Sequence, residues 1–105
     1  MTQNSLTLGE IVAWYRSKQI SLKGSTFSLV NIKEGAGGPK PAAAADFDGP
    51  NTMGQICGWV SGEFDIEAIR VPDGKDIFER HVDVSAVGEL ETAYADFLRK
   101  MQSSA

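Results

Sequence analysis

The sequence predicts an α+β fold, with an N-terminal helix, an antiparallel sheet of about five strands in meander order, and a C-terminal helix. Three observations lead to this prediction. Apolar residues recur with helical spacing near both ends of the 105-residue chain, they alternate with polar residues only between those ends, and no helical pattern separates successive strands. Strands without helical crossovers pair antiparallel, so we expect both helices to pack on one face of the sheet, in a single domain over residues 1–105.

The first helix is expected over residues 8–18. Thr7 and Glu10 have the spacing of a capping box, in which the two side chains satisfy amide groups left free at a helix start. Apolar residues then follow at i, i+3, i+4 and i+7, which predicts a buried face. These residues are Leu8, Ile11, Val12 and Tyr15, with Trp14 beside them.

Two strands and a loop are expected next. Residues 26–32 alternate and are rich in strand formers. Residues 34–41 contain three glycines and two prolines, which predicts a mobile loop. The segment 42–48 is short and rich in alanine, and we interpret it as a weak second strand bounded by the turn at 48–51.

The segments 54–60 and 63–69 predict a hairpin with Ser61 and Gly62 as a two-residue turn. In that register, one face of the hairpin is apolar and packs in the core. The other face carries carboxylates and points outward. The predicted packed pairs are Trp59–Phe64, Cys57–Ile66 and Gln55–Ala68, and the predicted outward pairs are Val60–Glu63, Gly58–Asp65 and Ile56–Glu67.

A bulged turn at residues 72–74, with Gly74 in a left-handed conformation, is expected to lead into the fifth strand. A two-residue turn would bury Glu79 and His81, which costs more than covering the stem of one arginine. The bulged register places Phe78, Arg80 and Val82 on the packed face, opposite Ala68, Ile66 and Phe64. It places His81 opposite Asp65, and Glu79 opposite Glu67, on the open face.

The last helix is expected after Ser85, which can serve as its N-cap. Its apolar face repeats over four turns and ends near Arg99 and Lys100, which suit a helix C-terminus. That face comprises Val87, Leu90, Tyr94, Phe97, Leu98 and Met101. The predicted core combines Trp59, Phe64, Ile66, Phe78 and Val82 with Val12, Leu90, Tyr94 and Phe97.

The charge is acidic and unevenly distributed. The chain carries 10 Lys and Arg against 14 Asp and Glu, and residues 51–105 hold five of the basic and ten of the acidic residues. This balance argues against nucleic acid or an anionic membrane as the main partner and suits a basic protein partner. The first twenty residues lack the pattern of a secretory signal, and no apolar run is long enough to span a membrane, so we expect a cytoplasmic protein.

Residues for catalysis or metal binding are few. Cys57 and His81 are the only cysteine and histidine. The predicted register puts Cys57 in the core and His81 on the open face, which disfavours a catalytic dyad. His81 with Asp65, Glu67 and Glu79 resembles a metal or acid–base cluster, yet the same residues suit a solvated polar face. We expect no catalytic residue, cofactor or metal.

The segment 54–69, followed by Val71, by residues 78–81 and by an acidic amphipathic helix, resembles the bacterial immunity proteins of the TriTu type. The resemblance covers about residues 54–102. It is carried by the pattern Gly-Gln-x-x-x-Trp-x-Ser-Gly-Glu-x-Asp-x-Glu, matched by Gly54, Gln55, Trp59, Ser61, Gly62, Glu63, Asp65 and Glu67.

The resemblance implies a small cytosolic protein that binds and neutralises a polymorphic toxin with ADP-ribosyltransferase activity, stoichiometrically and without catalysis. Two other classes remain open, namely an acidic secretion chaperone or adaptor and a small ligand- or metal-binding domain that uses the His81 cluster. The sequence also leaves a homo-oligomer open. An acidic sheet face would steer onto a basic toxin surface. The candidate partner-binding residues are Glu63, Asp65, Glu67, Glu79 and His81.

Overall fold

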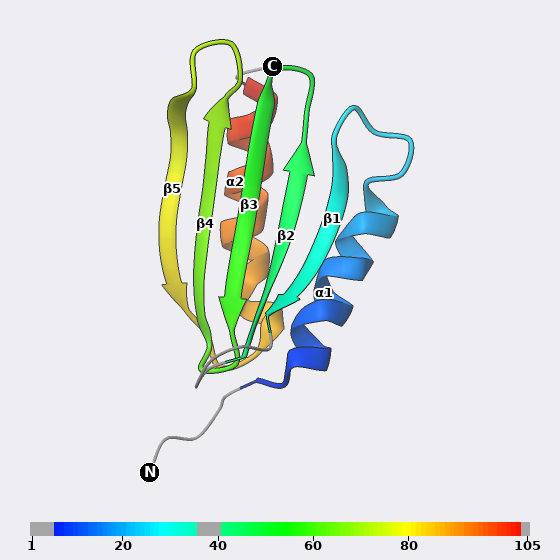
Figure 1. The fold of residues 1–105 in the computed structure, drawn as a ribbon, viewed down its shortest axis with the longest axis vertical. Coiled ribbons are helices and arrows are strands. Elements are labelled where there is room, and N and C mark those ends of the chain that lie inside the picture. The colour runs from blue at the N-terminus through cyan, green and yellow to red at the C-terminus, as the bar shows by residue number, and fades with distance from the viewer. Residues whose placement is uncertain (1–5, 36–40, 104–105) are drawn as a thin grey trace.

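The computed structural model describes residues 6–35 and 41–103. Five antiparallel strands form one sheet in the order β1-β2-β3-β4-β5, with a helix before it and a helix after it (Figure 1). The predicted α+β meander is therefore confirmed. The elements are α1 (Leu8–Ser21), β1 (Ser28–Gly35), β2 (Ala42–Asp48), β3 (Thr52–Trp59), β4 (Glu63–Arg70), β5 (Lys75–Asp83), the 3₁₀ helix η1 (Val87–Leu90) and α2 (Glu91–Ser103).

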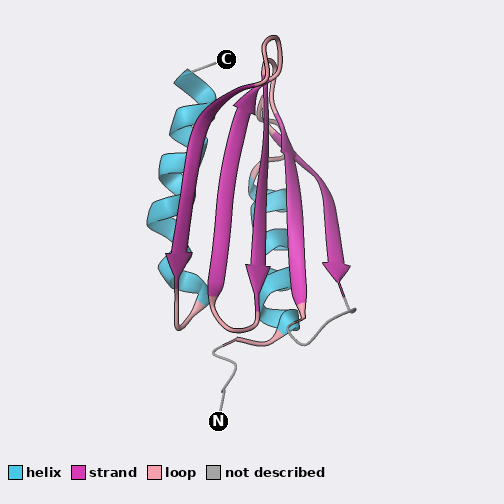
Figure 2. Ribbon diagram, turned by 60° about the vertical axis from the view of Figure 1, so that its left-hand side comes forward, coloured by secondary structure: helices cyan, strands magenta, loops and turns pink. Residues whose placement is uncertain are grey.

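Both helices lie on the same side of the sheet, as Figures 1 and 2 show from two directions. Helix α1 contacts β1 and β2, and α2 contacts β3, β4 and β5. The other side of the sheet has no helix over it in the described part of the chain. Neither helix among the described residues has the length and hydrophobicity needed to cross a membrane.

The core fills the space between the helices and the sheet. Aromatic rings form its centre. Trp14 packs edge-on against Tyr94, with 5.2 Å between the ring centroids, and Phe47 packs edge-on against Phe97, with 5.1 Å between the centroids. The predicted core residues Val12, Phe64, Ile66, Leu90, Tyr94 and Phe97 are buried, and Phe78 and Val82 are half-buried against them. Trp59 is the exception among the predicted core residues, because it lies on the opposite side of the sheet.

Helix α1 begins where the capping box predicts. The Thr7 hydroxyl accepts a hydrogen bond from the Glu10 amide at 3.1 Å, and the Glu10 carboxylate accepts one from the Thr7 amide at 2.9 Å. The helix continues to Ser21, three residues beyond the predicted end. Its buried residues are Ile11, Val12, Trp14 and Tyr15, which include the predicted apolar face except Leu8. Leu8 is half-buried and packs against the core.

The predicted register of β3 against β4 is wrong by one residue. Ile56 pairs with Ile66, Cys57 with Asp65, and Gly58 with Phe64. A shift of one residue exchanges the two faces of a strand. Gln55, Cys57 and Trp59 therefore point away from the core, whereas Ile56, Gly58 and Val60 point into it.

The turn and the core together explain this register. Residues 60–62 form a three-residue connection, with Gly62 at a φ of 96°, a conformation that glycine adopts without strain. Val60 is only 3% exposed, and its amide donates a hydrogen bond to the Pro41 carbonyl at 3.2 Å. Gly58 pairs with Phe64 on β4, and a Cβ on Gly58 would overlap the Phe64 ring, so Gly58 provides the space that this ring occupies.

The predicted register of β4 against β5 is confirmed over residues 63–68 and 78–83. Phe64 pairs with Val82, Asp65 with His81, Ile66 with Arg80, and Ala68 with Phe78. The bulge lies within β5, however, because Ile69 pairs with Asp76 and leaves Ile77 without an opposite residue. The connecting turn spans residues 71–74, and Gly74 has a φ of 68°.

Three local expectations also differ from the structure. Ser85 does not cap the last helix, since η1 begins after Ala86 without a side-chain cap. Strand β1 starts at Ser28 and extends to Gly35, so it takes the first two residues of the predicted 34–41 loop. Residues 36–40 of that loop lie outside the described residues. The weak second strand is confirmed as β2.

Candidate functional site

The side of the sheet turned away from both helices is called the open face here. Directly paired residues of antiparallel strands point to the same side, so the register identifies the side chains that share it. Two rows cross the whole sheet, and shorter groups lie at either end of β3. The rows are Lys33–Ala44–Cys57–Asp65–His81 and Asn31–Asp46–Gln55–Glu67–Glu79, and the groups are Asp48–Met53–Ile69–Asp76 and Ala42–Trp59 beside Glu63–Asp83.

Carboxylates dominate this surface. Asp46 is paired with Lys33 at 3.3 Å, and His81 is paired with both Asp65 at 2.7 Å and Asp83 at 3.5 Å. Within residues 6–35 and 41–103, no basic side chain forms an ion pair with Asp48, Glu67 or Glu79. The carboxylates on the open face are Asp46, Asp48, Glu63, Asp65, Glu67, Asp76, Glu79 and Asp83.

The register brings the five residues predicted for partner binding together on adjacent strands. Glu63, Asp65 and Glu67 alternate along β4, and Glu79 and His81 lie opposite on β5. Glu63 is half-buried and accepts a hydrogen bond from the Ser61 hydroxyl at 2.8 Å, while the other four are exposed. Asp83, which sequence reasoning did not include, lies opposite Glu63 and completes the group.

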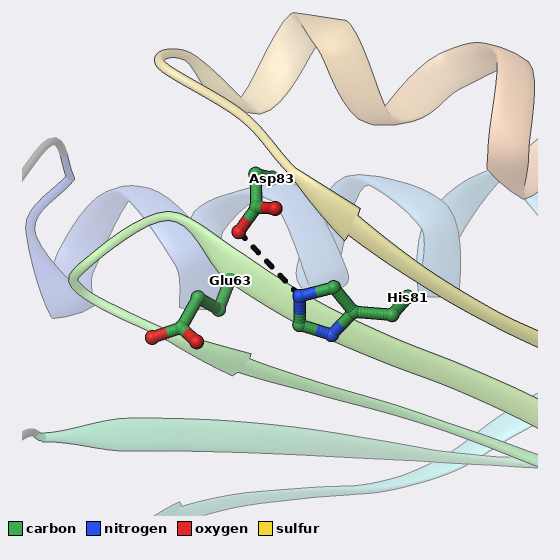
Figure 3. A group of neighbouring side chains, drawn as sticks. All are labelled: Glu63, His81 and Asp83. Carbon is green, nitrogen blue, oxygen red and sulfur yellow. Dashed lines mark ion pairs between the residues drawn. The ribbon is translucent and has the colours of Figure 1, made fainter.

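His81 lies between two carboxylates. Its Nδ1 is 2.7 Å from Asp65 Oδ1, and its Nε2 is 3.5 Å from Asp83 Oδ1, the ion pair drawn in Figure 3. The hydrogen bond to Asp65 raises the pKa of His81, and the negative charge of Asp83 raises it further. The imidazolium is therefore stabilised, and it neutralises part of the acidic group.

Glu63, His81 and Asp83 offer a set of ligand atoms that lie within 4.8 Å of one another (Figure 3). Two carboxylates and an imidazole are a known donor set for divalent metals. A metal requires the neutral imidazole, whereas the raised pKa of His81 favours the charged form. Both ring nitrogens also face carboxylates, so the contacts describe an ion-pair network.

Cys57 lies on the open face, half-buried, and not in the core as predicted. It lines a shallow hollow that also includes His81. Burial raises the pKa of the Cys57 thiol, and the nearby charges of Asp65 and Glu67 raise it further. A catalytic cysteine needs the opposite shift, toward the thiolate. The raised pKa of Cys57 therefore argues against a nucleophilic role, although Cys57 and His81 lie on the same face of the sheet and not on opposite faces as predicted.

The corrected register adds apolar side chains to the acidic surface. Trp59 is half-buried at one end of β3, and Met53 is 49% exposed at the other. The prediction missed both, because the Ser61-Gly62 pair suggested a shorter turn. The sequence signal that could have corrected the register is Val60. A three-residue connection over residues 60–62 allows this apolar side chain to be buried, as it is in the structure.

The chain matches the model of one protein family, that of the immunity protein TriTu, over residues 9–100. The match includes both helices almost completely and all five strands. A search among curated proteins gave no match. The family match extends well beyond the segment 54–102 on which the resemblance rested. The chain therefore belongs to the TriTu immunity protein family.

Proposed function

We propose that this immunity protein neutralises its cognate toxin by binding it stoichiometrically through the open face. Family membership supplies an immunity role and, in general terms, a toxin as the partner. The resemblance described above implies that the toxin is an ADP-ribosyltransferase, and we place the encounter in the cytoplasm. The fold supports this assignment, since both helices pack on one side and leave the other side of a five-stranded sheet for a partner.

The observation that carries the proposal is the density of carboxylates without cationic partners on the open face. Asp48, Glu67 and Glu79 form no ion pairs within the described part of the chain. These like charges repel one another. Their side chains point away from the core, so core packing does not offset that repulsion. Such a surface accelerates encounter with a basic protein and discriminates against acidic ones.

Affinity also requires buried anchors, which charged rims rarely supply. Trp59 suits this role because it lies at the edge of the acidic group, next to Glu63, with part of its surface accessible. Tryptophan is enriched among residues that dominate binding energy at interfaces. We propose Trp59 as an anchor, with Glu63, Asp65, Glu67, Glu79 and His81 around it.

Inhibition without catalysis agrees with the chemistry of the site. The two side chains most suited to acid–base or nucleophilic work are His81 and Cys57. His81 is held between carboxylates, and the thiol pKa of Cys57 is raised. The chaperone alternative has less support, because only Ile20, Val30, Met53 and Val71 are large exposed hydrophobic residues in the described part of the chain.

The test is a charge reversal on the open face. The double substitution Asp65→Lys with Glu67→Lys should weaken binding to the cognate toxin by at least roughly tenfold, about 1.4 kcal/mol, and should leave thermal unfolding within a few degrees of the parent. Isothermal titration calorimetry against the cognate toxin domain measures both the affinity and the stoichiometry. A molar ratio near one is expected.

The matched control is Glu34→Lys with Glu89→Lys. These two exposed residues lie outside the open face, Glu34 beside the inward-facing Ala43 and Glu89 in η1. The control changes the net charge by the same amount and should reduce affinity much less. Equal losses in the two double variants would assign the effect to net charge alone. An unchanged affinity in the open-face variant would exclude Asp65 and Glu67 from the interface.

A further inference from the structure

A hollow of about 530 Å³ lies on the open face near the start of β3. Its walls include Val30, Met53 and Ile69, which come from β1, β3 and β4. Val30 is the extra residue of a bulge in β1, where the pairing shifts between Leu29 and Asn31. Val30 therefore has no paired residue on β2, and it is 56% exposed. Its side chain forms one side of the hollow.

Apolar surface makes up most of the hollow, and carboxylates make up its rim. Met53 and Ile69 are directly paired and form a continuous apolar wall. Asp46, Asp48 and Glu67 also line the space. Asp46 is already satisfied, by Gln55 at 2.8 Å and by Lys33 at 3.3 Å, whereas Asp48 and Glu67 form no ion pair with any described residue.

We propose that this hollow receives one arginine or lysine side chain of the toxin. The inference rests on the proposed function and specifies the chemistry that the open face recognises. The aliphatic stem of a basic side chain packs against Val30, Met53 and Ile69, and its charged end reaches Asp48 or Glu67. Long basic side chains bury their methylene groups in this way while keeping the charge at a polar rim.

Other occupants fit these residues less well. A purely apolar side chain would cover Met53 and Ile69 but would desolvate two carboxylates without pairing them. A second copy of this chain would bring a net charge of −4 against an acidic rim. A basic side chain satisfies the apolar walls and the carboxylates together, so charge complementarity selects it.

The first experiment uses small probes in place of the toxin. In two-dimensional NMR, n-butylguanidinium should shift the amide signals of Val30, Met53 and Ile69 with saturating dependence on its concentration. Guanidinium alone and n-butanol should produce smaller shifts at these positions, because guanidinium lacks the alkyl chain and n-butanol lacks the positive charge. Equal shifts with all three probes, or shifts spread evenly over the protein, would overturn the proposal.

The second experiment measures binding of the toxin domain to Met53→Lys. The added charge should exclude a basic side chain and weaken binding at least roughly tenfold. Ile20→Lys is the matched control, since Ile20 is 65% exposed on α1, outside the open face. It should leave affinity near the parent value. Thermal unfolding should be similar for both variants, because both residues are exposed.

Failure of this inference is distinguishable from failure of the proposed function. If Asp65→Lys with Glu67→Lys weakens toxin binding while Met53→Lys binds like Ile20→Lys, the open face remains the interface and the hollow is not used. If neither open-face variant weakens binding, the proposed function itself is wrong. If Met53→Lys alone weakens binding and n-butylguanidinium competes with the toxin, the hollow is the contact site.

Discussion

The indole Nε1 of Trp14 donates a hydrogen bond to Oε2 of Glu91 at 2.8 Å, which joins α1 to the first turn of α2. Lys18 forms an ion pair with the same carboxylate at 2.7 Å. The Lys18 ammonium also lies 5.0 Å from the ring centroids of both Trp14 and Tyr94. One carboxylate therefore connects two helices that otherwise pack over different strands.

Replacement of Glu91 by Ala should lower the free energy of unfolding by about 1 kcal/mol, because the partly buried indole N–H of Trp14 loses its acceptor. Urea unfolding at neutral pH measures the change. The control is Glu89→Ala, at an exposed position in η1 where no comparable contact forms within the described residues. Similar losses in both variants would contradict a specific role for the Glu91 contact.

Phe64→Ala should lower the free energy of unfolding by roughly 3–5 kcal/mol, since the ring is fully buried and its removal leaves a cavity. Trp59→Ala should cost distinctly less, although tryptophan is the larger side chain, because Trp59 lies on the open face. Denaturant midpoints of the two variants compare them directly. A larger loss at Trp59 than at Phe64 would place Trp59 in the core and refute the register.

Gly58→Ala should destabilise the protein by about 1–3 kcal/mol through overpacking. The new methyl group would overlap the Phe64 ring, which is enclosed by the core and cannot withdraw freely. Gly88→Ala is the matched control, because no atom lies within 4 Å of the position its Cβ would take. The difference between the two unfolding midpoints tests the close approach of β3 and β4.

His81 should titrate above the ordinary histidine range, because its hydrogen bond to Asp65 raises its pKa. A raised pKa means that the folded state binds the proton more tightly than the unfolded state. The stabilisation from His81 is therefore complete below the unfolded pKa, about 6.5. It is lost as the pH rises through the folded pKa.

An NMR titration of the His81 ring protons measures this directly, since His81 is the only histidine. Asp65→Asn should move the midpoint down toward the ordinary value. Asp76→Asn serves as the control, because Asp76 is an exposed carboxylate farther along β5. Midpoints that stay the same in the parent and in Asp65→Asn would show that Asp65 does not hold the proton on His81.

Local signals predicted the parts of this fold that depend on local contacts. The capping box at Thr7 and Glu10 places the start of α1 because both of its hydrogen bonds form within one turn. The β4–β5 register was also predictable, because only one pairing keeps Glu79 and His81 out of the core. In both cases a wrong arrangement carries a penalty that is visible in the residues themselves.

The β3–β4 register was not predictable in this way. Both faces of β3 are largely apolar, so its alternation does not indicate which one packs. The deciding feature is Gly58, whose missing side chain gives space to Phe64 from the next strand. That requirement depends on a contact between strands and leaves no local pattern. As a result, the prediction gathered the acidic side chains correctly but missed Trp59, Cys57 and Met53 beside them.

Burial alternates along β4, so neighbouring residues are under different evolutionary constraints. Phe64, Ile66 and Ala68 are almost completely buried, whereas Glu63, Asp65 and Glu67 belong to the open face. Under the proposed function, the even-numbered positions maintain foldability and the odd-numbered positions determine which toxin is recognised. Substitutions at the odd-numbered positions can therefore change specificity as a toxin diverges without destabilising the fold. One short strand thus carries both the residues that must stay apolar and the residues that can vary.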